Sequence, residues 1–248
     1  MYHFFVDSTR INLSDKTVTI TGSDVNHIRN VLRMKIGEEL NVSNGQDGRE
    51  YRCAIESFEE NRIICRLRFV KEENVELPSR VYLFQALPKA DKMEMIIQKA
   101  VELGAYRIIP VAAKRCVVKL DEKKAAAKVA RWQGIAEAAA KQSKRAVIPE
   151  VSDVLSFSQA VKLASDMDIR LIPYELAEGM GNTRKIIDEL MPKQDIAVFI
   201  GPEGGFEEEE IQTAVDNGII PITLGKRILR TETAGMTVLS WIMYRLEG

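Results

Sequence analysis

The chain has 248 residues, of which 46% are hydrophobic and 29% are charged, and its formal net charge is -1. This composition is typical of a globular protein that can bury a full core, in one large domain or two modest ones. No apolar stretch is long enough for a membrane span, and the first residues, MYHFFVD, lack the features of a secretion signal, so we expect a cytoplasmic protein that does not bind membranes.

Short strands separated by turn sequences are predicted over roughly the first seventy residues. They cover residues 2–6, 16–21, 39–42, 49–57 and 63–70. They indicate a small β-barrel or sandwich, interrupted by one short helix over residues 24–34 with apolar side chains at helical spacing. The charged stretch 71–78 ends in proline and is typical of a linker. We therefore predict a first domain over residues 1–73 and a second over residues 74–248.

The second domain alternates predicted strands and helices, which is typical of a mainly parallel sheet with helices on both faces. The strands cover residues 81–87, 106–112, 169–174, 196–200 and 219–224, and the helices cover residues 91–103, 125–143, 156–165, 183–190, 207–217 and 231–246. Gly104 follows the first of these helices, where a C-terminal glycine is favoured. The fold class predicted for this part is α/β.

Charge is distributed unevenly along this second domain. Residues 107–145 hold eleven Lys or Arg against three acids, whereas residues 150–218 hold fifteen acids against five Lys or Arg. The basic segment is a candidate nucleic-acid surface, although a solvated helix face produces the same pattern. A second feature is needed to decide between the two interpretations.

A glycine-rich turn, GPEGGF at residues 201–206, follows the buried strand 196–200. Open backbone at the carboxyl edge of a parallel sheet is where α/β proteins bind ligands. The glycine spacing matches neither the dinucleotide pattern nor the P-loop, and four glutamates at residues 207–210 oppose a phosphate at the helix start. The turn therefore favours a neutral or cationic ligand held by main-chain groups, such as adenosine bearing a sulfonium. A tight turn before a well-capped acidic helix is the purely structural alternative.

A second glycine turn follows the strand 219–224, and the last helix begins at Thr231. Two such turns at strand ends predict one shared pocket. Thr231 and Glu232 have structural explanations as a helix cap and a first-turn acid. Arg230 does not, and an arginine at a pocket edge suits an anionic or carbonyl-rich substrate.

The remaining reactive residue types predict neither a nucleophile nor a metal site. Cys53, Cys65 and Cys116 are odd in number and lack the spacing of a disulfide framework or a zinc site, so we predict reduced thiols. His3 and His27 are too few and too distant in sequence to suggest a metal cluster.

Three segments carry a resemblance to a known family: residues 89–104 (KADKMEMIIQKAVELG), residues 201–206 and residues 224–234 (LGKRILRTETA). Together and in this order, over essentially the whole chain, they resemble the bacterial small-subunit ribosomal RNA uridine-N3 methyltransferases of the SPOUT class. The resemblance implies a trefoil-knotted α/β domain after a PUA-like RNA-binding β-barrel, S-adenosylmethionine as cofactor, and a homodimer formed through the knot. Two positions depart from the family, whose members often carry glutamate in place of Lys141 and alanine in place of Gly235.

The resemblance also implies an adenosine pocket made from three loops, which we place at Ile172, Tyr174, Ile200, Gly201, Gly205, Leu224, Gly225, Ile228 and Leu229. Methylation of uridine N3 requires loss of a proton and stabilisation of the resulting charge, for which we assign Glu232, in preference to Glu203, and Arg230. Contacts with RNA phosphates are expected from Arg10, Arg29, Arg33, Lys141, Lys144 and Arg145. The alternatives are methylation of another ribosomal or transfer RNA base, a non-catalytic RNA-binding protein, and a nucleotide-dependent oxidoreductase, whose fingerprint the chain lacks.

Overall fold

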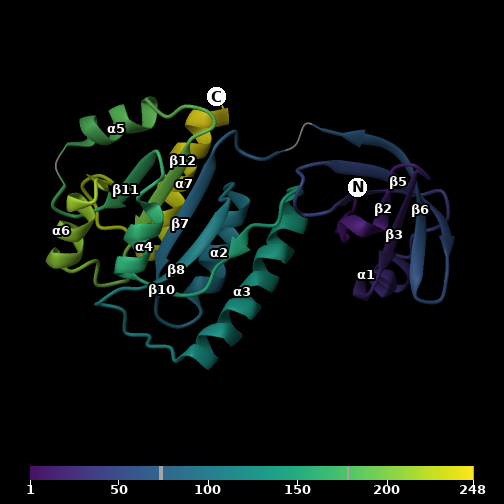
Figure 1. Cartoon of the computed structure of the whole chain (residues 1–248), viewed down its shortest axis with the longest axis horizontal. Coiled ribbons are helices and arrows are strands. Elements are labelled where there is room, and N and C mark those ends of the chain that lie inside the picture. The colour runs from purple at the N-terminus through teal and green to yellow at the C-terminus, as the bar shows by residue number, and fades with distance from the viewer. Residues whose placement is uncertain (73–74, 178, 248) are drawn as a thin grey trace. The chain divides into compact units, whose positions relative to one another are not determined.

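The computed structural model of the protein describes residues 1–72, 75–177 and 179–247. The chain folds into two compact units (Figure 1). The first contains Met1–Glu76 together with Ala140–Ile148, and the second contains Leu77–Ala139 and Pro149–Gly248. The domain boundary predicted between residues 73 and 74 lies outside the described residues. Within the described ranges, no helix has both the length and the apolar character needed to cross a bilayer.

The first unit is built on a curled six-stranded sheet (Figure 1). Its strands are β1 (His3–Phe5), β2 (Ile11–Asn12), β3 (Thr17–Thr21), β4 (Glu39–Ser43), β5 (Glu50–Phe58) and β6 (Arg62–Lys71). They lie in the order β1-β4-β5-β6-β3-β2, with β1 and β4 parallel and the other pairs antiparallel. The two alternate residues Val18 and Ile20 of β3 are fully buried, because successive side chains point to opposite faces of a strand. The five predicted strands are present, and β2 is an additional pair of residues.

The helix predicted over residues 24–34 is shorter and less regular than expected. An α-helical turn, α1 (Ser23–Asn26), continues into a π-helical turn over His27–Val31. The Leu32 N–H donates to the His27 carbonyl at 2.9 Å, a bond across five residues that widens the turn. Val25 and Ile28 are nevertheless buried in the core of the first unit, as their spacing predicts.

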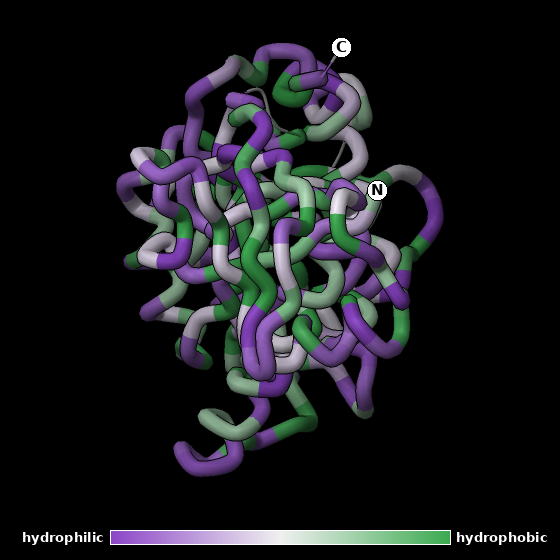
Figure 2. The backbone as a smooth tube through the Cα atoms, turned by 90° about the vertical axis from the view of Figure 1, so that its right-hand side faces the viewer, coloured by the Kyte–Doolittle hydropathy of each residue, from purple (hydrophilic) through white to green (hydrophobic). Residues whose placement is uncertain are grey.

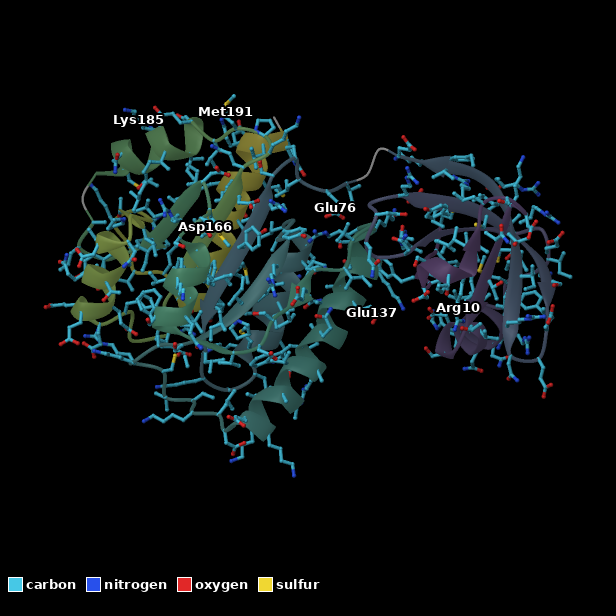
Figure 3. All side chains as sticks on the ribbon, viewed as in Figure 1. Arg10, Glu76, Glu137, Asp166, Lys185 and Met191 are labelled. Atoms are coloured by element: carbon cyan, nitrogen blue, oxygen red, sulfur yellow. The ribbon has the colours of Figure 1, made fainter. Side chains whose placement is uncertain are left out.

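The segment Ala140–Ile148 belongs to the first unit although it is distant from the rest of that unit in sequence. It contains the last residues of α3 (Glu122–Ser143) and the chain that follows. The Arg145 guanidinium forms hydrogen bonds with the Glu76 carboxylate, which lies beside the end of α3 (Figure 3). The Ile148 N–H donates to the Gly45 carbonyl at 3.0 Å. Main-chain and ionic contacts therefore join this segment to the rest of the first unit.

The second unit is built on a seven-stranded sheet in which every pairing is parallel. Its strands are β7 (Arg80–Ala86), β8 (Arg107–Ala112), β9 (Glu150–Val151), β10 (Leu155–Ser156), β11 (Ile169–Pro173), β12 (Asp195–Ile200) and β13 (Ile220–Ile222). Six of them lie in the order β10-β8-β7-β12-β11-β13, and β9 pairs with β8. The two-residue strands β9 and β10 are absent from the sequence prediction.

Helices cover both faces of this sheet. They are α2 (Lys92–Glu102), α3, α4 (Phe157–Ala164), α5 (Met180–Asp188), α6 (Glu208–Asp216) and α7 (Thr231–Glu247). On one face, Phe84 stacks on Phe199 with ring centroids 4.4 Å apart, and Phe199 meets Phe157 of α4. On the other, Leu83 lies against Gly235 of α7. Because neighbouring residues of a strand point to opposite faces, α4 and α7 lie on opposite sides of the sheet. Figure 2 shows hydrophobic stretches inside the fold and hydrophilic residues on most outer turns.

Candidate active site

Three strand ends meet at the carboxyl edge of the second unit's sheet. Strand β11 lies between β12 and β13, and all three run in the same direction. The Tyr174 N–H, just beyond β11, donates to the Ile222 carbonyl of β13 at 2.9 Å. The segments that follow these strands therefore lie side by side, in the place where open α/β sheets bind ligands.

The two glycine turns are in contact through the first residue of α7. The Thr231 hydroxyl donates a hydrogen bond of 2.6 Å to the Gly201 carbonyl, at the start of the first turn. Thr231 directly follows the second turn, so this bond holds the two turns together. The two turns are therefore neighbours at the edge of the sheet. The sequence predicts that Thr231 caps the last helix, but its hydroxyl instead bonds to the Gly201 carbonyl.

The glycines of the turns differ in what surrounds them. Gly205 and Gly225 have φ values of +68° and +104°, which favour glycine, and nothing lies within 4 Å of the position that a Cβ would occupy. At Gly201 a Cβ would lie 3.2 Å from the Gly205 Cα and 3.3 Å from the Phe206 ring. Gly201 is therefore required by the close packing of its own turn, whereas Gly205 and Gly225 leave their backbone open to a ligand.

A lysine joins the two acids closest to these turns. Lys92 Nζ lies 3.1 Å from a Glu203 oxygen and 3.4 Å from Glu232 Oε2, and the Lys89 N–H donates to Glu203 at 3.1 Å. Partial burial by itself raises the pKa of Glu203, but hydrogen bonds from its own N–H, from Lys92 and from Lys89 together hold that pKa below its ordinary value. Glu203 is therefore an ionised anchor for the segment after β7, which makes it a poor proton acceptor.

Glu232 is the more enclosed of the two acids. Its side chain is 12% exposed, against 27% for Glu203. The Oε2 atom of Glu232 is itself buried and faces the Lys92 ammonium as an ion pair. The Glu232 carboxylate is thus held at the start of α7 by a lysine that it shares with Glu203.

The acidic start of α6 is tied to the segment after β8. Arg115 donates to the Gly204 carbonyl at 2.8 Å and to Glu207 at 2.9 Å, and this guanidinium lowers the pKa of Glu207. The Lys114 N–H donates to Glu210 at 2.9 Å. Glu207 and Glu210 also form a reciprocal capping box at the helix start. Glu207 and Glu210 are thus explained by capping, hydrogen bonding and ion pairing, and Arg115 fixes the middle of the first turn.

Arg230 is exposed at the edge of this site. Within the described part of the chain its side chain has no hydrogen bond or ion pair, and the same holds for Lys226 and Arg227 of the second turn. The adjacent Ile228 is 82% exposed. The second turn therefore presents three uncompensated positive charges beside the first turn.

The predicted pocket residues fall on the three strand ends and their turns, but in different settings. Ile172 and Ile200 are buried within β11 and β12, so their side chains belong to the core and only their backbone is available at the edge. Tyr174, Leu224 and Leu229 are partly exposed.

The residues predicted to bind RNA lie in the first unit, and they are not equally available. Arg10, labelled in Figure 3, Arg33 and Lys144 are exposed. Arg29 donates to the Glu59 carbonyl and lies over the Phe58 ring.

Two further predicted RNA-binding residues have partners in the fold. Lys141 forms an ion pair of 3.5 Å with Asp24. Arg145 is only 3% exposed and is bonded to Glu76, so its position is that of a structural residue.

Three functional candidates escaped prediction from the sequence: Gln85, Lys92 and Arg115. Gln85 is a lone amide within an apolar strand, and that pattern could have marked it. Lys92 lies within the segment 89–104 that carries the family resemblance. Arg115 follows β8 and has no local signal, because its partners are about ninety residues away in sequence.

Comparison with known proteins identifies the class to which this architecture belongs. A family model described as an RNA methyltransferase domain matches residues 75–243, and a model described as an RNA methyltransferase PUA domain matches residues 20–68. The class is that of RNA methyltransferases carrying a PUA domain. A relative from Bacillus subtilis (strain 168), named ribosomal RNA small subunit methyltransferase E, is 40% identical over 100% of this chain and 98% of its own length. The chain belongs to the family of the ribosomal RNA small subunit methyltransferases E.

Two solved structures of similar proteins contain a cofactor. A putative methyltransferase from Legionella pneumophila, in complex with bound SAM, is 33% identical, with a TM-score of 0.82 over 98% of this chain and 96% of that chain. A ribosomal RNA small subunit methyltransferase E from Neisseria gonorrhoeae, bound to S-adenosyl methionine, is also 33% identical, with a TM-score of 0.81 over 97% of this chain and 96% of that chain.

Proposed function

We propose that this protein transfers a methyl group from S-adenosylmethionine to N3 of a uridine in small-subunit ribosomal RNA. The observation that carries the proposal is the bond between Thr231 and Gly201, because it unites two glycine turns into one site at the carboxyl edge of a parallel sheet. The names of the relatives supply the class of RNA, and the cofactors of two related structures supply the methyl donor.

The residues of the site suit this cofactor. Gly205 and Gly225 offer unobstructed backbone, and the carboxylates of Glu203 and Glu232 favour a positively charged ligand over a phosphate. We assign the adenosine pocket to the three adjacent segments, at Ile172, Tyr174, Ile200, Gly201, Gly205, Leu224, Gly225, Ile228 and Leu229. When bound, S-adenosylmethionine supplies the methyl group and a thioether leaving group.

The acceptor chemistry requires a base and a cation. N3 of uridine carries a proton at neutral pH, and its removal spreads negative charge onto O2 and O4. We assign proton removal to Glu232, whose carboxylate lies at the start of α7 directly after the second turn, and charge stabilisation to the exposed Arg230. Lys92 then holds the Glu232 carboxylate in place, and Glu203 anchors the turn.

RNA docking is assigned to the first unit and to the second glycine turn. In the first unit we retain Arg10, Arg33 and Lys144, because they are exposed, whereas Arg145 is enclosed by its own ion pair. Phosphate contacts of this kind weaken steeply with salt. Binding of the small ribosomal subunit is therefore expected to fall strongly between 50 and 200 mM salt.

We further propose that the α/β domain is knotted, that the protein acts as a homodimer, and that it works in the cytoplasm, where ribosomal RNA is found. Large apolar side chains are exposed around the candidate site and on α7, with Leu176 at 71%, Ile228 at 82% and Tyr244 at 82% exposure. Large exposed apolar side chains of this kind are available to a protein interface. Sedimentation equilibrium of the full chain tests this, and a monomer at micromolar concentration would refute the dimer.

One assay tests the central proposal. Purified protein is incubated with labelled S-adenosylmethionine and small ribosomal subunits that lack the modification, and the labelled nucleoside is identified. We expect 3-methyluridine; another methylated base would refute the assignment of N3, and an unlabelled RNA would refute the transfer itself.

Variants then separate binding from chemistry. Arg230→Ala and Glu232→Gln should each lower turnover by about 100-fold, within the range for removal of one charge-stabilising or acid-base group. Calorimetric affinity for the cofactor should change little in Arg230→Ala. Arg10→Ala is the comparison, because it should raise KM for the RNA and leave cofactor affinity unchanged. Unaltered turnover in both site variants would refute the two assignments.

A further inference from the structure

A glutamine lies within the buried part of strand β7. The strand reads RVYLFQA, and the Gln85 side chain is fully buried, at 0% exposure. A buried amide is unfavourable unless its polar atoms are hydrogen-bonded, whereas an apolar residue of similar size has no such requirement. Packing alone therefore does not explain an amide at this position.

Gln85 donates both of its amide hydrogens. Its Nε2 donates to the Thr231 hydroxyl at 2.9 Å and to the Ala86 carbonyl at 3.0 Å, while its Oε1 has no partner within the described residues. A hydroxyl carries one proton. Because the Thr231 oxygen accepts from Gln85, its proton is directed away from the amide, to the Gly201 carbonyl at 2.6 Å.

The result is a relay of hydrogen bonds across three elements that are distant in sequence. It runs from Gln85 on β7 to Thr231 at the start of α7, and then to Gly201 at the end of β12. The Thr231 side chain is 5% exposed, so water competes little for these bonds. The donors and acceptors of the relay are neutral, so its bonds do not depend on pH in the physiological range.

We propose that Gln85 and Thr231 are positioning residues for methyl transfer. In sequence, Thr231 lies between Arg230 and Glu232, the two residues to which we assign charge stabilisation and proton removal. The relay therefore sets the position of both residues relative to the turn that begins at Gly201. This inference rests on the function proposed above, because it concerns the alignment of the two reacting partners.

Alignment of this kind has a recognisable kinetic effect. A displacement of about 1 Å between reacting groups can reduce the rate by about 100-fold. A bond that merely stabilises the fold changes the melting temperature but leaves turnover of the folded enzyme intact. The two roles therefore differ in kcat, measured below the melting temperature of each variant.

The test uses near-isosteric changes in the full-length protein. Thr231→Val removes the hydroxyl, Thr231→Ser keeps it, and Gln85→Met removes the donor that orients it. Thr237→Val is the matched control, because Thr237 lies in the same helix and donates to the Thr233 carbonyl at 2.8 Å, a bond within that helix. Each variant is assayed for kcat at saturating cofactor and ribosomal subunits, for cofactor affinity by calorimetry, and for melting temperature.

We expect Thr231→Val and Gln85→Met each to lower kcat at least tenfold, and the double variant to be no slower than the slower single variant. Thr231→Ser should recover most of the activity, and Thr237→Val should be unaffected. If Gln85→Met does not fold, the pair Thr231→Val and Thr231→Ser still decides. A wild-type kcat in Thr231→Val, or a loss that Thr231→Ser does not recover, overturns the relay. Absence of transfer by the wild-type protein instead overturns the proposed function.

Discussion

Gly235 occupies a helical position where a larger residue should stabilise the protein. It lies inside α7 and is buried between that helix and the sheet. A Cβ at this position would lie 3.7 Å from Gln85 Oε1, 3.7 Å from Ile200 Cγ1 and 4.0 Å from Leu83 Cδ1, all ordinary van der Waals distances. The space for a methyl group at this position is therefore present.

The expected gain of Gly235→Ala has two parts. Replacing glycine by alanine inside a helix gains about 1 kcal/mol. Burying one more methyl group adds up to about 0.8 kcal/mol. The free energy of unfolding should thus rise by about 1 to 2 kcal/mol. Urea unfolding followed by tryptophan fluorescence measures this, because Trp132 and Trp241 both lie in the second unit.

Gly134→Ala separates these two parts. Gly134 lies in α3, also in the second unit, and nothing lies within 4 Å of its would-be Cβ. Its gain should therefore be the helical part alone, about 1 kcal/mol. A Gly235→Ala protein that is less stable than the wild type would refute the packing argument.

Three further changes test other parts of the structure. Gly201→Ala should shift the first turn and weaken cofactor binding, measured by calorimetry. The loss should exceed that of Gly204→Ala, since a Cβ at Gly204 meets only a flexible side chain at 3.5 Å. Equal losses of affinity in the two variants would contradict this. Arg145→Ala removes one side of a buried ion pair and should lower unfolding free energy by about 3 to 5 kcal/mol in circular dichroism, whereas the exposed Lys144→Gln should change it by less than about 0.5 kcal/mol. Burial lowers the pKa of His3 from 6.5 to about 4, so the unfolded chain binds a proton between these pH values and the native one does not. About 3 kcal/mol of the free energy of unfolding present at neutral pH should therefore be lost as pH falls from about 6.5 to 4. The His3→Gln variant should not show this loss. Parallel curves of unfolding free energy against pH for the two proteins would refute the prediction.

The fold could be predicted from the sequence wherever one periodic pattern covers a whole element. Strand β12 and helix α6 follow from a run of apolar residues and from a glycine turn before an acidic helix start. The short strands β9 and β10 could not be found, because two residues carry no periodicity and their pairing with β8 depends on tertiary structure. The π-helical turn over His27–Val31 is likewise invisible, since apolar spacing does not distinguish it from an α-helix.

The candidate site could be predicted in outline but not in its contacts. Glycine turns after two buried strands are local features, and parallel strands place their ends on one edge, so the meeting of the turns followed from the sequence. The partners of Thr231 and Arg115 depend on residues far away in the chain. Arg145 shows the same limit, because its charge suggests RNA while Glu76, which it contacts, is 69 positions away.

The first unit is built from two separate stretches of sequence, which matters for the design of truncated fragments of this protein. The segment Ala140–Ile148 supplies a β-bridge to Gly45 and two N–H donors to the Glu76 carboxylate. A fragment that stops at residue 76 would therefore lack part of its own fold. Neither unit is one continuous stretch of sequence, so neither can be produced as a single continuous fragment. Any chimera that transplants the β sheet onto another methyltransferase must carry two separate stretches of sequence, and both junctions must be rebuilt together.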